Sequence, residues 1–155
     1  MATLNYRHRF LVQAPLEMVA RFHAQSDSMR AIAPPPIVVQ MHTAPTELAE
    51  GDEMVFSLWF GPLPVRWRAR IEDVTPAGFI DRQLAGPFET WVHRHSFLPI
   101  DETTTEIRDE IELTLQRNPF WSMVGMAMRI NLPFLFVYRA WRTQRLLTAG
   151  RQPAE

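Results

Sequence analysis

Apolar and polar residues alternate along much of the chain, which is the pattern of β-strands that bury one face. The clearest case is Val65 to Val74, where four apolar residues alternate with three arginines and Glu72. Further strands are predicted at Tyr6 to Val12, Ile37 to His42, Glu53 to Phe60, Phe79 to Ala85, Glu89 to Pro99 and Thr105 to Leu115. The pattern therefore predicts an antiparallel sheet of about seven strands.

Two short helices are predicted between the first and second strands. Pro15 opens one of them, because proline is favoured at the start of a helix, and Asp27 can cap the other, which must end before Pro34. The last two strands reach or exceed about ten residues, and strands of that length twist and curve. The element order predicts an α+β fold in one domain over residues 1–155, with a curved sheet around the long helix that ends the chain.

That third helix is predicted to run from Pro119 towards Ala149, with Gly150 as a stop and a kink at Pro133. Its first part, Phe120 to Tyr138, is long enough to span a membrane, but an arginine at position 129 near its centre is costly in a bilayer. We therefore expect a helix packed inside the protein.

The amino-acid composition excludes several kinds of functional site. The chain has 155 residues, a net charge of −1 and no cysteine, so disulfides, zinc ribbons and a cysteine nucleophile are excluded. All sixteen basic residues are arginine, so a lysine Schiff base is excluded as well. The near-neutral charge argues against nucleic-acid binding. Ten Phe, five Trp and eight Met form a large apolar content, and the N-terminal residues lack the pattern of a signal peptide, so we expect a cytoplasmic protein.

Several motifs resemble one superfamily. The segments that carry the likeness are the A-P-x-E-x-V element at residues 14–19, the proline segment at 26–35, the run Phe79-x-Asp81-x-Gln83-x-x-Gly86-Pro87-Phe88 with Trp91-x-His93-x-His95-x-Phe97, and Phe136-x-Tyr138-Arg139. Together with the element order they resemble the START-like superfamily, the helix-grip fold also called SRPBCC, and in particular its polyketide cyclase/dehydrase branch. The resemblance implies a cavity between the sheet and the long helix. Relatives bind lipids, sterols, polyketides or other apolar molecules there, and some catalyse cyclisation or dehydration.

A polar cluster is predicted inside the sheet. Trp91, His93, His95 and Phe97 alternate along one strand and so share a face. If residues 100–104 form a loop, His95 lies opposite Asp109 on the next strand, with Cβ atoms about 5 Å apart. We expect the carboxylate to favour imidazolium and to raise the pKa of the histidine.

Asp81 and Gln83 are harder to orient. A simple two- or four-residue turn at Gly86-Pro87 would place them on the opposite face from His93, whereas an odd loop or a bulge would turn them inward. The family resemblance favours the inward orientation.

Three functions stay open. The first is a binding protein for a small hydrophobic ligand such as a lipid, polyketide or isoprenoid-like molecule, with no cofactor and no metal. Its expected ligand-binding residues are Phe56, Trp67, Asp81, Gln83, Trp91, His93, His95, Asp109, Met128 and Leu132. The second is a cyclase or dehydratase in which His93, His95 and Asp109 perform acid–base chemistry.

The third is an adaptor that meets a membrane or a protein surface weakly through the basic terminal helix, whose arginines are at positions 129, 139, 142 and 145. Beyond residue 112 the only acidic residue is Glu155. Whether the cluster is merely a satisfied hydrogen-bond network in the core is also open, as is the choice between monomer and homodimer.

Overall fold

A computed structural model describes residues 2–149, so Gly150 and Glu155 lie outside the described residues. The expected α+β order is confirmed. The elements are β1 (Leu4–Val12), α1 (Leu16–Ala24), α2 (Ser28–Ala31), β2 (Val38–Thr43), β3 (Glu53–Phe60), β4 (Leu63–Thr75), β5 (Gly78–Ala85), β6 (Phe88–Pro99), β7 (Thr105–Leu115) and α3 (Pro119–Ala149).

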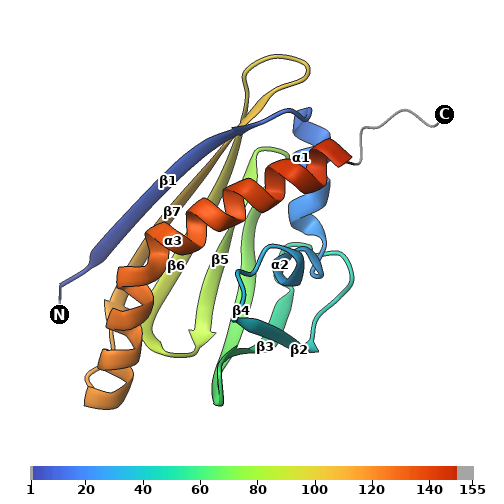
Figure 1. Cartoon of the computed structure of the whole chain (residues 1–155). Helices are drawn as coiled ribbons and strands as arrows, with labels where there is room; N and C mark the ends of the chain where they lie inside the picture. Colours follow the sequence, from blue (N-terminus) through green and yellow to red (C-terminus); the bar gives the residue numbers. More distant parts are fainter. Residues whose placement is uncertain (1, 150–155) are drawn as a thin grey trace.

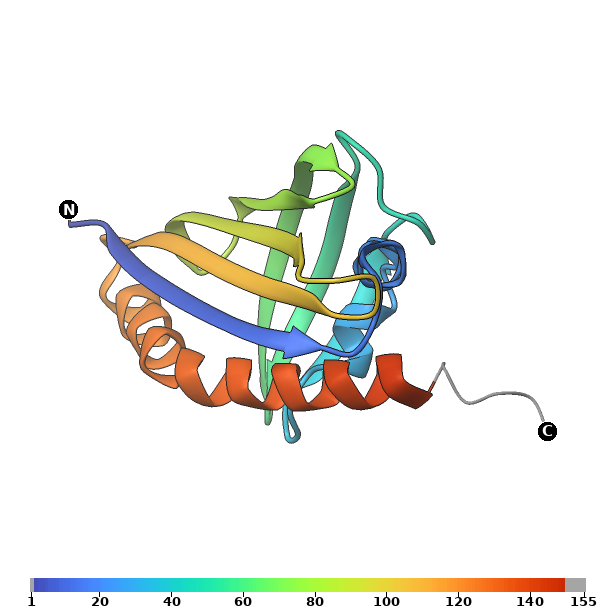
Figure 2. The ribbon, with the colours of Figure 1, turned by 90° about the horizontal axis from the view of Figure 1, so that it is seen from above.

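The seven strands form one antiparallel sheet in the order β1-β7-β6-β5-β4-β3-β2. Every neighbouring pair except β1–β7 is also consecutive in the chain, so most of the sheet is built from hairpins. The sheet is strongly curved, and α3 lies along its concave side, as Figures 1 and 2 show. The helix-grip architecture expected from the sequence is therefore present.

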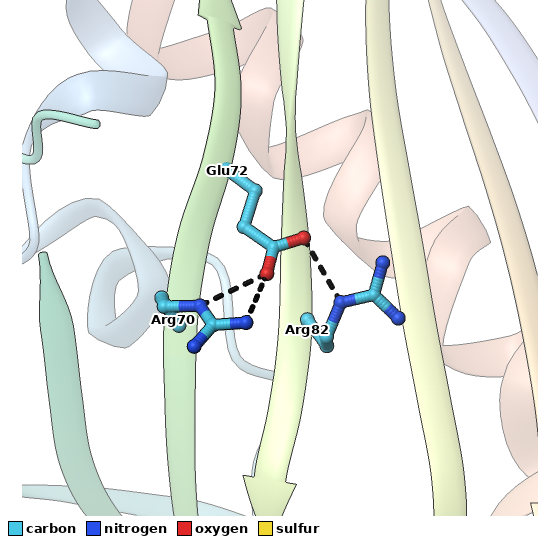
Figure 3. Close-up of polar contacts among 3 residues, drawn as sticks. All are labelled: Arg70, Glu72 and Arg82. Atoms are coloured by element: carbon cyan, nitrogen blue, oxygen red, sulfur yellow. Dashed lines mark hydrogen bonds and ion pairs between the residues drawn. The ribbon is translucent and has the colours of Figure 1, made fainter. Parts of the chain in front are cut away.

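The outer face of the sheet is polar and carries several ion pairs, as the alternation of apolar and polar residues in β4 predicts. Val65 and Trp67 are buried, whereas Arg66 and Arg68 are exposed. Glu72 accepts hydrogen bonds from Arg70 and from Arg82 on the adjacent β5, the latter at 2.9 Å between Nε and Oε2 (Figure 3). These hydrogen bonds lower the pKa of Glu72. Exposed pairs of this kind contribute roughly 0–1 kcal/mol, so the polar face favours solubility more than stability.

The long helix packs on the sheet with one face only. Asn118 caps the helix, because its side-chain oxygen accepts a hydrogen bond from the Phe120 backbone N–H at 3.0 Å. The helix contains Pro133, and Figure 2 shows that it changes direction along its length, as expected for a helix with an internal proline. Leu132 and Phe136 are almost fully buried against the sheet. The face of α3 that points away from the sheet is exposed, so the expectation of a helix packed inside the protein is wrong for that face. Only 17% of the most apolar 18-residue stretch of the helix is buried.

Candidate ligand-binding site

A cavity of about 760 Å³ lies between the concave face of the sheet and α3, and it reaches the loop before β2. Phe56 and Trp67 line it from β3 and β4, Trp91 lines it from β6, and Met128 and Leu132 line it from α3. All five were expected as ligand-binding residues from the sequence. Pockets of roughly 300–1,000 Å³ with mostly apolar walls accept drug-sized molecules.

Contacts between aromatic rings fix the side chains that line the sheet side of the cavity. The rings of Phe56 and Trp67 are stacked at 6.0 Å between centroids, and Trp67 meets Trp91 edge-on at 5.2 Å. Such pairs are each worth about 0.5–1.5 kcal/mol beyond the area they bury. These three aromatic side chains therefore form a fixed part of the cavity wall.

The polar cluster lies beside this wall, with the register that the sequence predicts. β6 and β7 pair His95 with Asp109 and Phe97 with Ile107. The hydrogen bond, however, comes from the neighbouring histidine, because His93 Nε2 donates to Asp109 Oδ1 at 2.8 Å. His95 Nδ1 lies 3.4 Å from the same oxygen, and the two imidazoles are stacked at 3.8 Å between centroids. Asp109 thus contacts both imidazole rings but is not one of the residues that line the cavity.

Asp81 faces into the cavity, whereas Gln83 does not. β5 and β6 pair Asp81 with His93, so the inward orientation is confirmed for Asp81. Gln83 closes the β5–β6 turn instead: its Nε2 donates to the Phe88 carbonyl at 2.8 Å, and its Oε1 accepts from the Phe88 N–H at 3.3 Å. The amide is therefore used for turn geometry, outside the residues that line the cavity.

Two titratable residues of the cavity wall, His23 and Arg139, were not expected from the sequence. His23 reaches the cluster from α1, where its Nδ1 donates to the Val19 carbonyl at 2.8 Å and its ring lies 4.7 Å from the ring of Phe97. Arg139 lines the cavity from α3, with its guanidinium 5.1 Å from the centre of the Phe136 ring. The spacing Leu132, Phe136, Arg139 places the arginine near the buried face of a helix and was an available signal. His23 carries no such signal, because α1 meets β6 only in the folded chain.

Burial controls the protonation of this cluster. Desolvation lowers the pKa of His95 and of His23 to about 4 each, and it also lowers the pKa of His93. Burial alone would raise the pKa of Asp109, but the hydrogen bond from His93 and the nearby ring of His95 bring it well below its usual range. The expectation that the carboxylate raises the pKa of His95 is therefore wrong, because desolvation of the imidazolium outweighs the attraction of Asp109. Near neutral pH the histidines are uncharged and Asp109 is ionised.

Two buried polar atoms of the cluster lack partners. Among residues 2–149, no hydrogen-bond partner is present for Asp81 Oδ1 or for His95 Nδ1. Burial raises the pKa of Asp81, with His95 and Arg139 acting in the opposite direction. Unpaired buried polar atoms are costly, each roughly 1–3 kcal/mol, and they are commonly paired by water or by a ligand. The cluster can therefore offer both acceptors and donors to a polar group inside the cavity.

The same cluster has the composition of a metal site. Asp81, His93 and His95 each offer one ligand atom, and these atoms lie within 4.8 Å of one another. Arg139 lines the same cavity and interacts electrostatically with Asp81. A fixed positive charge there opposes a second cation, so the arrangement suits a polar organic group better.

Comparison with known proteins places the fold. No family model matches the chain, and no curated protein matches it. Solved structures do match over nearly the whole chain. TTHA0849 from Thermus thermophilus is 13% identical with a TM-score of 0.74, covering 96% of this chain and 100% of its own. The ZhuI aromatase/cyclase from a Streptomyces species is 16% identical with a TM-score of 0.69, covering 96% and 99%.

A third match is norcoclaurine synthase from Thalictrum flavum, solved in complex with dopamine and hydroxybenzaldehyde. It is 10% identical with a TM-score of 0.68, and the match covers 98% of this chain and 90% of that one. At these identities the likeness concerns the fold. This chain therefore has the same fold as these proteins, which is the helix-grip fold expected from the sequence.

The buried histidines predict a loss of stability in acid. An unfolded histidine titrates near 6.5, whereas His23 and His95 titrate near 4 when folded, so between those pH values the unfolded chain binds more protons. Stability should therefore fall as pH falls from about 6.5 to about 4, by up to about 3 kcal/mol per histidine, measured by urea denaturation. The raised pKa of Asp81 acts in the opposite direction, and Asp109 adds to the loss at still lower pH.

His95→Gln should flatten this pH dependence, and His42→Gln, at a histidine bonded to Ser57 away from the cavity, is the matched control. A free energy of unfolding that stays constant between pH 6.5 and 4 would show that the buried histidines are not neutral.

Proposed function

We propose that the protein binds a small hydrophobic molecule in the cavity and orients its polar end at the histidine–carboxylate cluster. The observation that carries this proposal is an apolar cavity of about 760 Å³ whose wall includes His93, His95 and the carboxyl group of Asp81, with Asp81 Oδ1 buried and unpartnered. An apolar body would bind by removing apolar area from water, at roughly 25 cal/mol per Å². The cytoplasmic location expected from the sequence is part of this proposal.

The chemistry of the cluster selects the polar end of the ligand. With uncharged imidazoles, His93 has one ring nitrogen that donates to Asp109 and one that is free to accept. A hydroxyl or a phenol can donate to such a nitrogen and accept from Arg139 in the same cavity. A hydroxylated polyketide, isoprenoid or lipid therefore fits better than a purely hydrocarbon molecule. The norcoclaurine synthase complex supports this class, since that protein holds phenolic molecules in the same fold.

The alternative is an enzyme of the cyclase or dehydratase type. Its supporting observation is the His93–Asp109 hydrogen bond at 2.8 Å, with an uncharged His95 stacked on His93 and facing the cavity. An uncharged imidazole next to a bound molecule can accept a proton, which is the role of a general base. The likeness of the fold to an aromatase/cyclase supports the same alternative.

Filling the cavity should remove ligand binding. Met128 lines the cavity from α3, whereas Met126 lies on the exposed side of the same helix. We expect native mass spectrometry to detect an apolar molecule that co-purifies with the wild type. Met128→Trp should lower its retention, and the affinity for the fluorescent probe N-phenyl-1-naphthylamine, by about tenfold or more, whereas Met126→Trp should leave both unchanged. Equal binding by the two variants, or no binding by the wild type, would refute the proposal.

The enzyme alternative predicts a separation of binding from turnover. His95→Ala should abolish conversion of the recovered ligand, followed by liquid chromatography and mass spectrometry, while N-phenyl-1-naphthylamine still binds within about threefold of the wild-type affinity. His42→Ala is the control outside the cavity. Conversion that continues in His95→Ala would exclude His95 as the base.

A further inference from the structure

The exposed side of α3 is apolar along most of its length. Six residues recur every three or four positions on that side, and between 39% and 68% of each is exposed: Met123, Met126, Ile130, Phe134, Val137 and Trp141, called here the outer stripe. The intervals follow the helical period, so the residues form one continuous line. Soluble monomers rarely expose a contiguous apolar face of this kind without a partner for it.

The charges around the outer stripe are of one sign. From Leu113 to Ala149 the chain contains no aspartate or glutamate, whereas α3 carries four arginines, of which Arg139 lines the cavity and Arg142 and Arg145 are at the surface. Arg145 lies directly beside the stripe, with its guanidinium 5.2 Å from the centre of the Trp141 ring. A second copy of this helix would bring arginines against arginines. The complementary surface is therefore anionic.

The outer stripe also borders the opening of the cavity. Met123 and Phe134 belong to the stripe, are 63% and 65% exposed, and yet line the cavity. Leu63, 37% exposed at the start of β4, lines the cavity as well. A surface that covers the stripe would therefore meet the entrance through which an apolar molecule must pass.

We propose that the outer stripe docks on an anionic lipid bilayer, with α3 lying in the plane of the membrane surface and the cavity opening towards the lipid. Helices with bulky apolar residues on one side and arginines beside them bind such interfaces. The docking itself rests on the exposed stripe and the charges, and only the passage of ligand rests on the proposed function.

The helix lies on the bilayer and does not cross it. α3 is long and apolar enough to span a membrane, but its other face is occupied by protein. Phe136 packs 5.4 Å from the ring of Tyr6 and 5.6 Å from that of His93, and Arg129 donates to the Asn5 carbonyl at 3.0 Å. Crossing would break these contacts and expose the concave face of the sheet, whereas docking changes neither.

Vesicle sedimentation tests the docking. The wild type should sediment with vesicles of phosphatidylcholine and phosphatidylglycerol, much less with phosphatidylcholine alone, and less as salt is raised. Ile130→Ser with Val137→Ser, at two stripe residues that do not line the cavity, should lower the partition coefficient by about tenfold or more. The matched control is Leu11→Ser with Ile100→Ser, at apolar residues that are also exposed (51% and 57%) but lie outside α3. No sedimentation of the wild type, or equal loss in both double variants, would overturn the proposal.

Self-association is the competing outcome. If analytical ultracentrifugation shows a dimer that Ile130→Ser with Val137→Ser disrupts, and the wild type does not sediment with anionic vesicles, the stripe is a dimer interface and the proposal is overturned.

The same variants separate docking from ligand binding. A stripe variant that still binds N-phenyl-1-naphthylamine but transfers it to anionic vesicles more slowly than the wild type supports docking at the cavity entrance. A wild type that sediments with vesicles but binds no probe would refute the proposed function and leave the docking standing.

Discussion

The register between β6 and β7 is the constraint on which the rest of this structure depends. Pairing His95 with Asp109 and Phe97 with Ile107 decides which side chains of both strands face α3. A slip of β7 by one residue against β6 would turn Asp109 to solvent and bring Glu110 to the side of the histidines. The contact between the histidines and Asp109 beside the cavity therefore depends on this one set of backbone hydrogen bonds.

Given this register, desolvation determines which side chains of the polar cluster are charged. Asp109 attracts a proton to its histidine neighbours, but His95 is only 6% exposed and its pKa falls to about 4. Among His93, His95 and Asp109, the charge is on the Asp109 carboxylate, which accepts a hydrogen bond from His93. The imidazoles next to the cavity are uncharged and one of their nitrogens is unpaired, which suits a ligand with a hydroxyl more than an anionic one.

The strands, their order and the β6–β7 register followed from the sequence, because apolar and polar residues alternate cleanly and the loop at residues 100–104 is short. The orientation of Asp81 needed the family resemblance, since a turn at Gly86-Pro87 permits either face. Gln83 could not be placed, because its role depends on one turn geometry. The exposed side of α3 was missed for a physical reason: a helix with apolar residues on most sides gives no pattern that tells which side meets the sheet.

The central claim is that the buried histidines are uncharged and bind the polar end of an apolar ligand. Nitrogen-15 shifts of the imidazoles at pH 7, recorded with 2-naphthol and with naphthalene, test it most directly. We predict that His93 and His95 are uncharged in the free protein and that 2-naphthol, unlike naphthalene, shifts the ring nitrogens of the cluster. Imidazolium signals from these residues in the free protein, or identical shifts with the two compounds, would contradict it.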